Sequence, residues 1–290
     1  MMGAAWVLRG RSRRSMTWGR RTVVLVAPHL ATVTIRPMIS SARVKDPPKP
    51  SARDVAAAEP ALTREIRGAL RFHGDDQINP YRFADALWAG ARAVGATVLP
   101  HTEGCRVLVN AAGAWAGQIA AMAGTGVPVT PVRGQIVCAE TLPKVITACV
   151  STTDCYLAQQ HHGEVIIGST TDRVGYDTAV TATATRTLAE GAVRAVPTLA
   201  GATVKRVWAG LRPGSPDELP ILGPVDGLDG YLNACGHFRT GILNAPLTGL
   251  VISEPAAGVA PTHPIEPFLL SRFTAGQPVV PETRESLTVQ

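Results

Sequence analysis

Two arginines lie in glycine-flanked segments whose residue types suit the binding of an anion. Arg239 belongs to "GHFRTGI" (236–242), directly before a predicted helix over Ile242–Gly258. The N-terminal end of a helix is already partly positive, so a cation at this place predicts that an anion binds there. Arg212 lies in "VWAGLRPGSPDELPILG" (207–223), and its guanidinium can hold a carboxylate through two parallel hydrogen bonds.

Each of these residues also has a purely structural interpretation. Arg212 could form a surface ion pair with Asp217 or Glu218 across the "PGSPDE" turn, although the sequence favours a binding pocket. His237 could hydrogen-bond a ligand, or its ring could be satisfied by the backbone. The sequence does not separate these two interpretations of His237.

The segments that would position these residues are of two kinds. A helix is predicted over 79–95, with Asn79 as N-cap and Gly95 as terminator. "CRVLVNAAGAWAGQIAAMAG" (105–124) predicts a buried strand, a small-residue turn and a second helix, which together open an α/β nucleotide-binding unit. The middle of the chain predicts a mostly antiparallel sheet with a hairpin tip at 161–162 and one helix at about 182–196.

Composition narrows the classes of partner. Of the net charge of +6, residues 1–45 carry eight Arg and one Lys with no acid, so the remaining residues are net negative. This distribution and the 5% aromatic content argue against a nucleic-acid-binding surface. No apolar run reaches the roughly 18 residues of a transmembrane helix. The five cysteines and seven histidines have no metal-ligand spacing, so we expect no metal site and reduced thiols in the cytoplasm; organelle targeting by the basic N-terminus is the alternative.

Five motifs follow one another in a fixed order, and they are "NAAGAW" (110–115), "PVRGQ" (131–135), "CYL" with "EVIIGSTTD" (155–172), "VWAGLRPGSPDELPILG" (207–223) and "GHFRTGILNAPLTG" (236–249). This ordered set resembles the D-amino acid oxidase family of flavoenzymes. Within the family it is most similar to the branch of glycine oxidase and of the hydrogen cyanide synthase and opine oxidase subunits. The resemblance covers roughly residues 50–273.

The resemblance implies FAD and the oxidative deamination of a small amino acid such as glycine, sarcosine or a D-amino acid, by hydride transfer to flavin. Oxygen or a redox partner would accept the electrons, and a homo- or hetero-oligomer is expected. Arg212 would clamp the substrate carboxylate, with Arg239 at the flavin end of the same pocket and Tyr156 directing its hydroxyl toward the substrate; a packing role is the alternative for Tyr156. The resemblance implies cofactor contacts from Asn110, Ala111, Ala112, Gly113, Gly210, Gly236, His237, Gly241 and Ile242.

The sequence departs from the family where the cofactor phosphates would bind. It contains no G-x-G-x-x-G turn, and the family has a longer run before "RVLVNAAG", including a strand at the adenine half. This chain alone therefore lacks the turn that usually binds the FAD pyrophosphate. The alternative function is a truncated, non-catalytic binding or scaffold protein.

We thus expect a mixed α/β fold, in which an incomplete glutathione-reductase-like FAD-binding domain is interleaved with an antiparallel-sheet substrate domain. The predicted organisation is a basic extension without ordered structure (1–46), a partial FAD-binding domain with the start of the substrate domain (47–124), the substrate-binding domain (125–209), the C-terminal part of the FAD-binding domain (210–273) and a tail (274–290).

Overall fold

The structure is a computed structural model, and it describes residues 5–9, 22–26, 51–66, 69, 77–97 and 105–273. The chain forms two compact units. Unit 1 comprises Met1–Arg36, Ile78–Val132 and Arg212–Glu282, and unit 2 comprises Pro37–Gln77, Arg133–Leu211 and Thr283–Gln290. Each unit is assembled from segments that are distant in the sequence.

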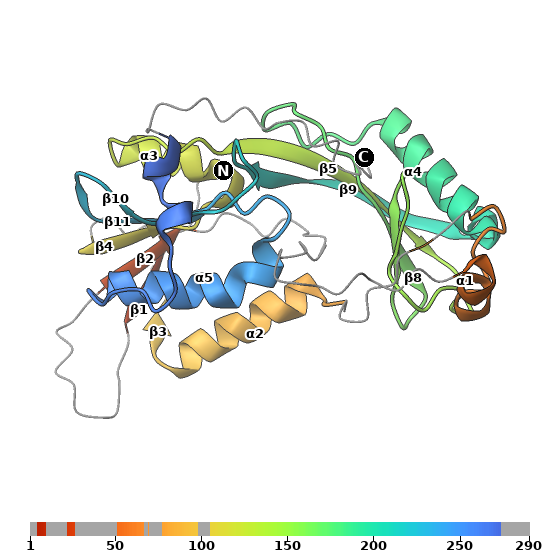
Figure 1. The fold of residues 1–290 in the computed structure, drawn as a ribbon, viewed down its shortest axis with the longest axis horizontal. Helices are drawn as coiled ribbons and strands as arrows, with labels where there is room; N and C mark the ends of the chain where they lie inside the picture. The colour runs from red at the N-terminus through yellow and green to blue at the C-terminus, as the bar shows by residue number, and fades with distance from the viewer. Residues whose placement is uncertain are drawn as a thin grey trace. The chain divides into compact units, whose positions relative to one another are not determined.

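Unit 1 contains a six-stranded mixed sheet with the strand order β10-β11-β4-β2-β1-β3 (Figure 1). Its strands are β1 (Ala5–Arg9), β2 (Thr22–Val26), β3 (Ala96–Thr97), β4 (Val107–Asn110), β10 (Ile221–Val225) and β11 (Leu228–Cys235). The central strands β11, β4 and β2 are parallel. β10 pairs antiparallel with β11, β1 pairs antiparallel with β2, and β3 pairs antiparallel with β1. In open α/β sheets, ligands bind beyond the carboxyl ends of such parallel strands.

Helices pack on both faces of this sheet. On one face, α5 (Gly241–Ala256) shares a buried cluster with Val109 and Leu232. On the other face, α3 (Ala116–Met122) shares a second cluster with Cys235. Short 3-10 turns flank these helices at η1 (Gly113–Trp115), η3 (Glu266–Phe268) and η4 (Leu270–Phe273).

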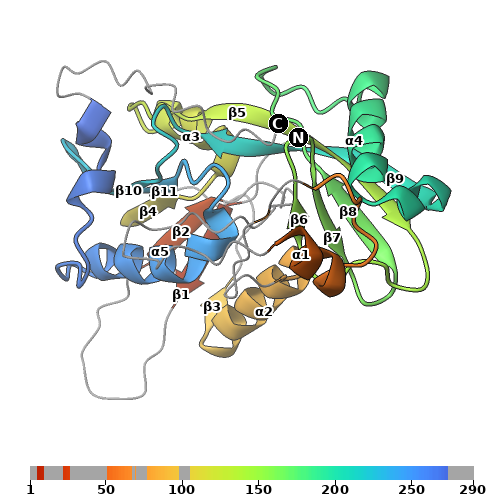
Figure 2. The same ribbon diagram turned by 45° about the vertical axis from the view of Figure 1, so that its right-hand side comes forward.

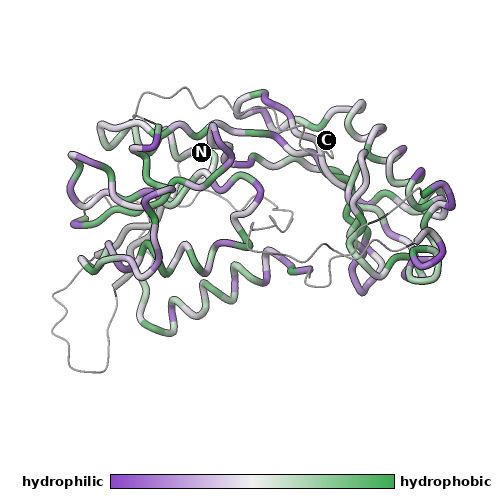
Figure 3. The backbone as a smooth tube through the Cα atoms, viewed as in Figure 1, coloured by the Kyte–Doolittle hydropathy of each residue, from purple (hydrophilic) through white to green (hydrophobic). Residues whose placement is uncertain are grey.

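Two of the predicted helices are present, and a local end signal explains where the first of them begins. The helix predicted over 79–95 is confirmed as α2 (Pro80–Ala93), and the side chain of Asn79 accepts a hydrogen bond from the Arg82 N–H at 3.1 Å. The helix predicted from Ile242 is confirmed as α5, which starts one residue earlier and carries no charged side chain before Glu254. Figure 3 shows the hydropathy of the chain along its backbone.

Part of the basic N-terminal region is ordered, which corrects the prediction of an extension without structure over 1–46. The segments "AWVLR" (β1) and "TVVLV" (β2) are apolar and rich in β-branched residues, and such segments favour strands. β2 pairs in parallel with β4 and lies between β4 and β1, so it is a central strand of the sheet. The other residues of 1–46, and the tail after 273, lie outside the described residues.

Unit 2 contains a five-stranded sheet with the strand order β6-β7-β8-β5-β9 (Figure 2). Its strands are β5 (Thr130–Glu140), β6 (Val150–Ser151), β7 (Tyr156–Gln159), β8 (Glu164–Gly168) and β9 (Thr203–Gly214), and its helical elements are α1 (Ala52–Ala58), α4 (Ala182–Ala195) and η2 (Pro197–Gly201). The pairs β5–β8, β6–β7 and β7–β8 are antiparallel, and the predicted tip at 161–162 is the exposed turn between β7 and β8. Leu157, Val165 and Leu188 join the sheet and α4 in one buried cluster.

The buried carboxylate of Glu59 fixes the end of α1. It accepts hydrogen bonds from the N–H groups of Thr147 (3.0 Å) and Ala148 (2.7 Å) and from the Thr147 hydroxyl. We expect Glu59→Ala to lower the free energy of unfolding by about 3 kcal/mol, because it leaves these donors unpaired. Urea titration measures this change, with the exposed Glu65→Ala as control, and equal stability of the two variants would contradict the expectation.

Candidate cofactor and substrate site

The two arginine-bearing segments meet in unit 1. Arg212 is buried, and the carbonyl of the next residue, Pro213, accepts a hydrogen bond from the N–H of Phe238 at 2.9 Å. Gly214 also forms a β-bridge with His237. Arg239 follows Phe238 directly in the sequence. The residues next to Arg212 and the residues next to Arg239 are therefore joined by these two backbone contacts.

The turn over 236–240 has an unusual backbone. Gly236 has φ +72°, and a Cβ there would lie 3.3 Å from Cγ1 of Ile221 and 3.4 Å from Cβ of Ser215. Phe238 also adopts a positive φ of 48°, which is uncommon for a bulky side chain. Such strained residues gather at functional sites, where the surrounding structure holds them in place.

This turn leads directly into the N-terminus of α5. The hydroxyl of its N-cap residue, Thr240, donates to the His237 carbonyl at 2.9 Å and makes no capping hydrogen bond to the helix. Among the described residues, no acceptor binds the N–H groups of Gly241, Ile242 or Leu243. These donors and the positive end of a 16-residue helix suit an anion or an electron-rich ring edge.

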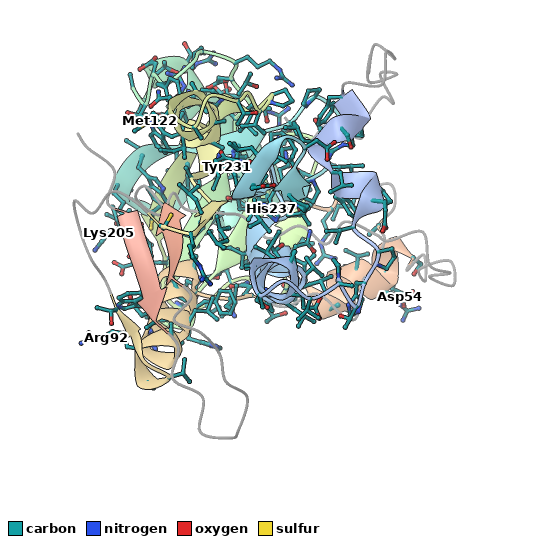
Figure 4. The ribbon with its side chains drawn as sticks, turned by 90° about the vertical axis from the view of Figure 1, so that its left-hand side faces the viewer. Asp54, Arg92, Met122, Lys205, Tyr231 and His237 are labelled. Carbon is teal, nitrogen blue, oxygen red and sulfur yellow. The ribbon has the colours of Figure 1, made fainter. Side chains whose placement is uncertain are left out.

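His237, which belongs to this turn, is buried and its ring contacts α5. Its Nε2 lies 2.9 Å from the hydroxyl oxygen of Thr248, so the partner is a side chain of α5 rather than the backbone group that the structural interpretation named. Burial lowers the pKa of His237 to about 4, and the ring is therefore neutral at pH 7. Figure 4 looks along α5 and labels His237 and Tyr231.

The turn after β4 has an ordered polar support. The Asn110 side chain donates to the Ala116 carbonyl at 2.9 Å and to the Tyr231 hydroxyl at 2.7 Å, and it accepts from the Ala112 N–H at 3.3 Å. Burial raises the pKa of Tyr231 to about 12, so its hydroxyl stays protonated. Gly113 has φ +57°, and a Cβ there would meet nothing within 4 Å. The backbone from Ala111 to Gly113 is thus fixed by Asn110 and open to a neighbouring molecule at Gly113.

These observations test how well the residues fit FAD. The uncapped helix N-terminus and the neutral His237 fit the ring end of the cofactor, and the open glycine at the end of β4 fits a second backbone contact with the dinucleotide. Asn233, on the same side of β11 as Tyr231, is fully buried, and within the described part of the chain its Nδ2 and Oδ1 have no hydrogen-bond partner. The phosphate end has no glycine-rich turn in the sequence, and residues 27–50, which follow β2, lie outside the described residues.

Three other predicted site residues lie elsewhere than in the turns described above. Tyr156 belongs to unit 2, where it lies opposite Gly168 and its ring fills the space of a Cβ at that glycine. Gly210 lies on β9, two residues before Arg212, and Ile242 is the second residue of α5. The roles predicted for these three residues remain predictions.

Sequence reasoning missed one pair beside the arginines. The carboxylate of Asp217 binds Arg272, with Arg272 Nε at 2.8 Å from Oδ2 and Nη2 at 3.1 Å from Oδ1. The acidic residue was visible in the "PGSPDE" turn, but no local signal indicates a partner 55 residues away. The described residues hold no cluster of metal-ligating side chains, and none of their helices is long and apolar enough to cross a membrane.

Comparison with known proteins places these features in a family. The DAO family model, described as "FAD dependent oxidoreductase", matches residues 6–254. Hydrogen cyanide synthase subunit HcnC of Pseudomonas protegens is 47% identical over 240 residues, which are 75% of this chain and 58% of that protein. Glycine oxidase of Pseudomonas putida is 37% identical over 161 residues, covering 56% of this chain and 44% of that enzyme.

Solved structures agree with the sequence comparison. The crystal structure of glycine oxidase from Geobacillus kaustophilus matches with a TM-score of 0.73 and 28% identity, over 78% of this chain and 67% of that one. The chain spans about 58% of the length of the HcnC proteins that it matches. The family match includes β4, both arginine-bearing segments and most of α5. The chain belongs to the DAO family of FAD-dependent oxidoreductases.

Proposed function

We propose that this chain oxidises a small amino acid, such as glycine, sarcosine or a D-amino acid, with FAD as cofactor. The observation that carries the proposal is the backbone link between the two arginine-bearing segments, through Pro213–Phe238 and Gly214–His237. When bound, FAD supplies the acceptor for the hydride that leaves the substrate α-carbon. The names of the glycine oxidases among the relatives support a small amino acid as substrate.

In this proposal, Arg212 holds the substrate carboxylate and Arg239 lies at the flavin end of the pocket. A buried guanidinium is well suited to this task, because it binds a carboxylate bidentately and excludes water from the pair. The Asp217 carboxylate in the following loop is bound by Arg272.

The N-terminus of α5 would support the ring end of the cofactor. The N–H groups of Gly241 and Ile242 can donate to a ring edge on which negative charge develops. A neutral His237 adds hydrogen-bonding capacity without a second positive charge. Asn110, through the turn that it fixes, positions the backbone from Ala111 to Gly113 for a second contact with the dinucleotide.

One observation favours a second candidate, a non-catalytic binding or scaffold protein derived from such an oxidase. The sequence contains no glycine-rich turn of the kind that binds the cofactor pyrophosphate. The HcnC relative is named as a subunit of hydrogen cyanide synthase, which supports an oligomeric assembly for this chain as well.

Reconstitution with FAD distinguishes the two candidates. After incubation with FAD and removal of the free cofactor, we expect the protein to show flavin absorbance at about 370 and 450 nm. Anaerobic addition of glycine, sarcosine or D-alanine should then bleach the band at about 450 nm with one of the three. A folded protein that stays colourless would contradict the proposed oxidase and support the binding protein.

A further inference from the structure

Helix α1 and the segment that follows it line a pocket of about 450 Å³ in unit 2. Such a volume lies within the range of about 300–1,000 Å³ that is common for the binding sites of small ligands. Two arginines line the pocket together with four apolar side chains, and these residues are Arg53, Arg64, Ala56, Ala57, Leu62 and Ile66. None of them belongs to the candidate cofactor and substrate site, so the proposed oxidase does not explain this pocket.

One wall of the pocket is a single face of α1. Ala56 and Ala57 follow Arg53 by three and four residues, so all three side chains lie on the same side of the helix. Each alanine has only one side-chain carbon, and this small size leaves room for a ligand between α1 and the opposite wall. The side chain of Ser51 accepts from the Asp54 N–H at 3.2 Å and fixes the start of the helix.

The opposite wall, residues 62–66, is held by the core of unit 2. The N–H of Leu62 donates to the Glu59 carbonyl at 3.1 Å, and the N–H of Thr63 donates to the carbonyl of Ala195, the last residue of α4, at 2.8 Å. The Leu62 side chain packs against the buried cluster that joins the sheet and α4. Contacts outside the pocket thus fix both walls, and a ligand need not order them.

The two arginines give the pocket a positive charge. Arg53 and Arg64 are exposed, and neither guanidinium has an ion-pair partner within the part of the chain that the structure describes. The Asp54 carboxylate next to Arg53 instead accepts from the Ser51 N–H at 3.0 Å and from the Ser51 hydroxyl at 2.7 Å. The described residues that line the pocket include no acid, so the positive charge is available to a ligand.

We propose that this pocket binds a small organic acid, whose carboxylate contacts Arg53 and Arg64 and whose apolar chain packs against Ala56, Ala57 and Leu62. A guanidinium matches the planar geometry of a carboxylate, and the three apolar side chains favour removal of an alkyl chain from water. A neutral apolar molecule would leave both cations without a partner. A bare inorganic anion would make no use of the apolar wall.

Titration with three probes tests the two halves of this recognition. By isothermal titration at low ionic strength, octanoate should bind more tightly than acetate, which lacks the apolar chain, and more tightly than 1-octanol, which lacks the charge. Added salt should weaken the binding of octanoate but not that of 1-octanol, because both arginines are exposed to solvent. If acetate or 1-octanol binds as tightly as octanoate, the proposal is overturned.

Variants place the octanoate in this pocket. Arg53→Gln and Arg64→Gln should each weaken octanoate binding about fivefold, as expected for the loss of one exposed ion pair. Ala56→Leu keeps both arginines but occupies the space of the alkyl chain, so it should also weaken the binding. Arg186→Gln, which removes an exposed arginine of α4, should bind like the wild type.

The same titration separates this pocket from the candidate substrate site. Octanoate bound at Arg212 would respond to Arg212→Ala and not to the three pocket variants, and that result would overturn the proposal. The three pocket positions are exposed or half-buried, so the circular dichroism spectra of the variants should match that of the wild type. The measurement requires neither FAD nor turnover, so its outcome does not depend on the proposed oxidase activity.

Discussion

Replacing Arg212 with Ala should raise the KM for the amino acid substrate by about 100-fold or abolish flavin reduction altogether. Two parallel hydrogen bonds between a guanidinium and a carboxylate contribute together about 3 kcal/mol, which corresponds to that factor. Because Arg212 is buried, water reaches the vacated position poorly, and the substrate carboxylate would lose hydration without gaining a partner. Steady-state kinetics of the reconstituted protein measures the effect.

Two further variants make this expectation specific to Arg212. Arg212→Lys keeps the charge but not the planar fork, so it should recover only part of the lost affinity. Arg206→Ala removes a cation from the exposed part of the same strand, where the guanidinium stacks on Trp208 at 5.2 Å from the ring centre. We expect near-normal KM from Arg206→Ala. If Arg212→Ala behaves in the same way, Arg212 does not bind the carboxylate.

The parts of the fold that the sequence predicts are those with local signals. Asn79 and Pro80 mark the start of α2, and Thr181 caps α4 by accepting from the Ala184 N–H at 3.2 Å. The tip at 161–162 is set by the adjacent Gly163, which has φ +101°. In each case a few consecutive residues determine the conformation, so periodicity and end signals are sufficient.

The parts that could not be predicted depend on contacts between distant segments. β1 and β2 lie in a region whose positive charge indicates an extension, yet pairing with β3 and β4 makes them part of the sheet. The Asp217–Arg272 pair joins residues 55 positions apart, and the sequence alone offers Asp217 only the nearby Arg212 as a partner, which is the less favoured alternative for that arginine. Asn233 reads as one polar residue in a strand, and only the three-dimensional arrangement shows that its amide is buried without a partner among the described residues.

The hydrogen-bond partner of His237 differs from both partners that the sequence suggests. The sequence leaves a choice between a ligand contact and a backbone contact, and the structure adds a third partner, the Thr248 hydroxyl, about two helical turns into α5. This hydrogen bond ties the arginine-bearing turn to the helix behind it. A role in positioning the turn is therefore compatible with a role beside the cofactor.

Gly236→Ala should lower the free energy of unfolding by about 2–3 kcal/mol and weaken FAD binding at the same time. An alanine at φ +72° is strained, and its Cβ would press on Ile221 at 3.3 Å and Ser215 at 3.4 Å, so neighbours on two sides would have to move. Ser215 belongs to the loop after Arg212, and its displacement would disturb both arginine-bearing segments.

Gly249→Ala is a matched control in the same unit, because Gly249 lies inside α5 and a Cβ there meets nothing within 4 Å. This second substitution should raise the stability by about 0.5–1 kcal/mol, since alanine favours a helix more than glycine does. Thermal unfolding and FAD titration of the two variants separate the effect of an added methyl group from that of its position. If both variants unfold at the wild-type temperature, the close packing of Gly236 between Ile221 and Ser215 does not constrain the turn. If only Gly236→Ala loses stability and cofactor together, the fold and the candidate site depend on the same close approach of backbone.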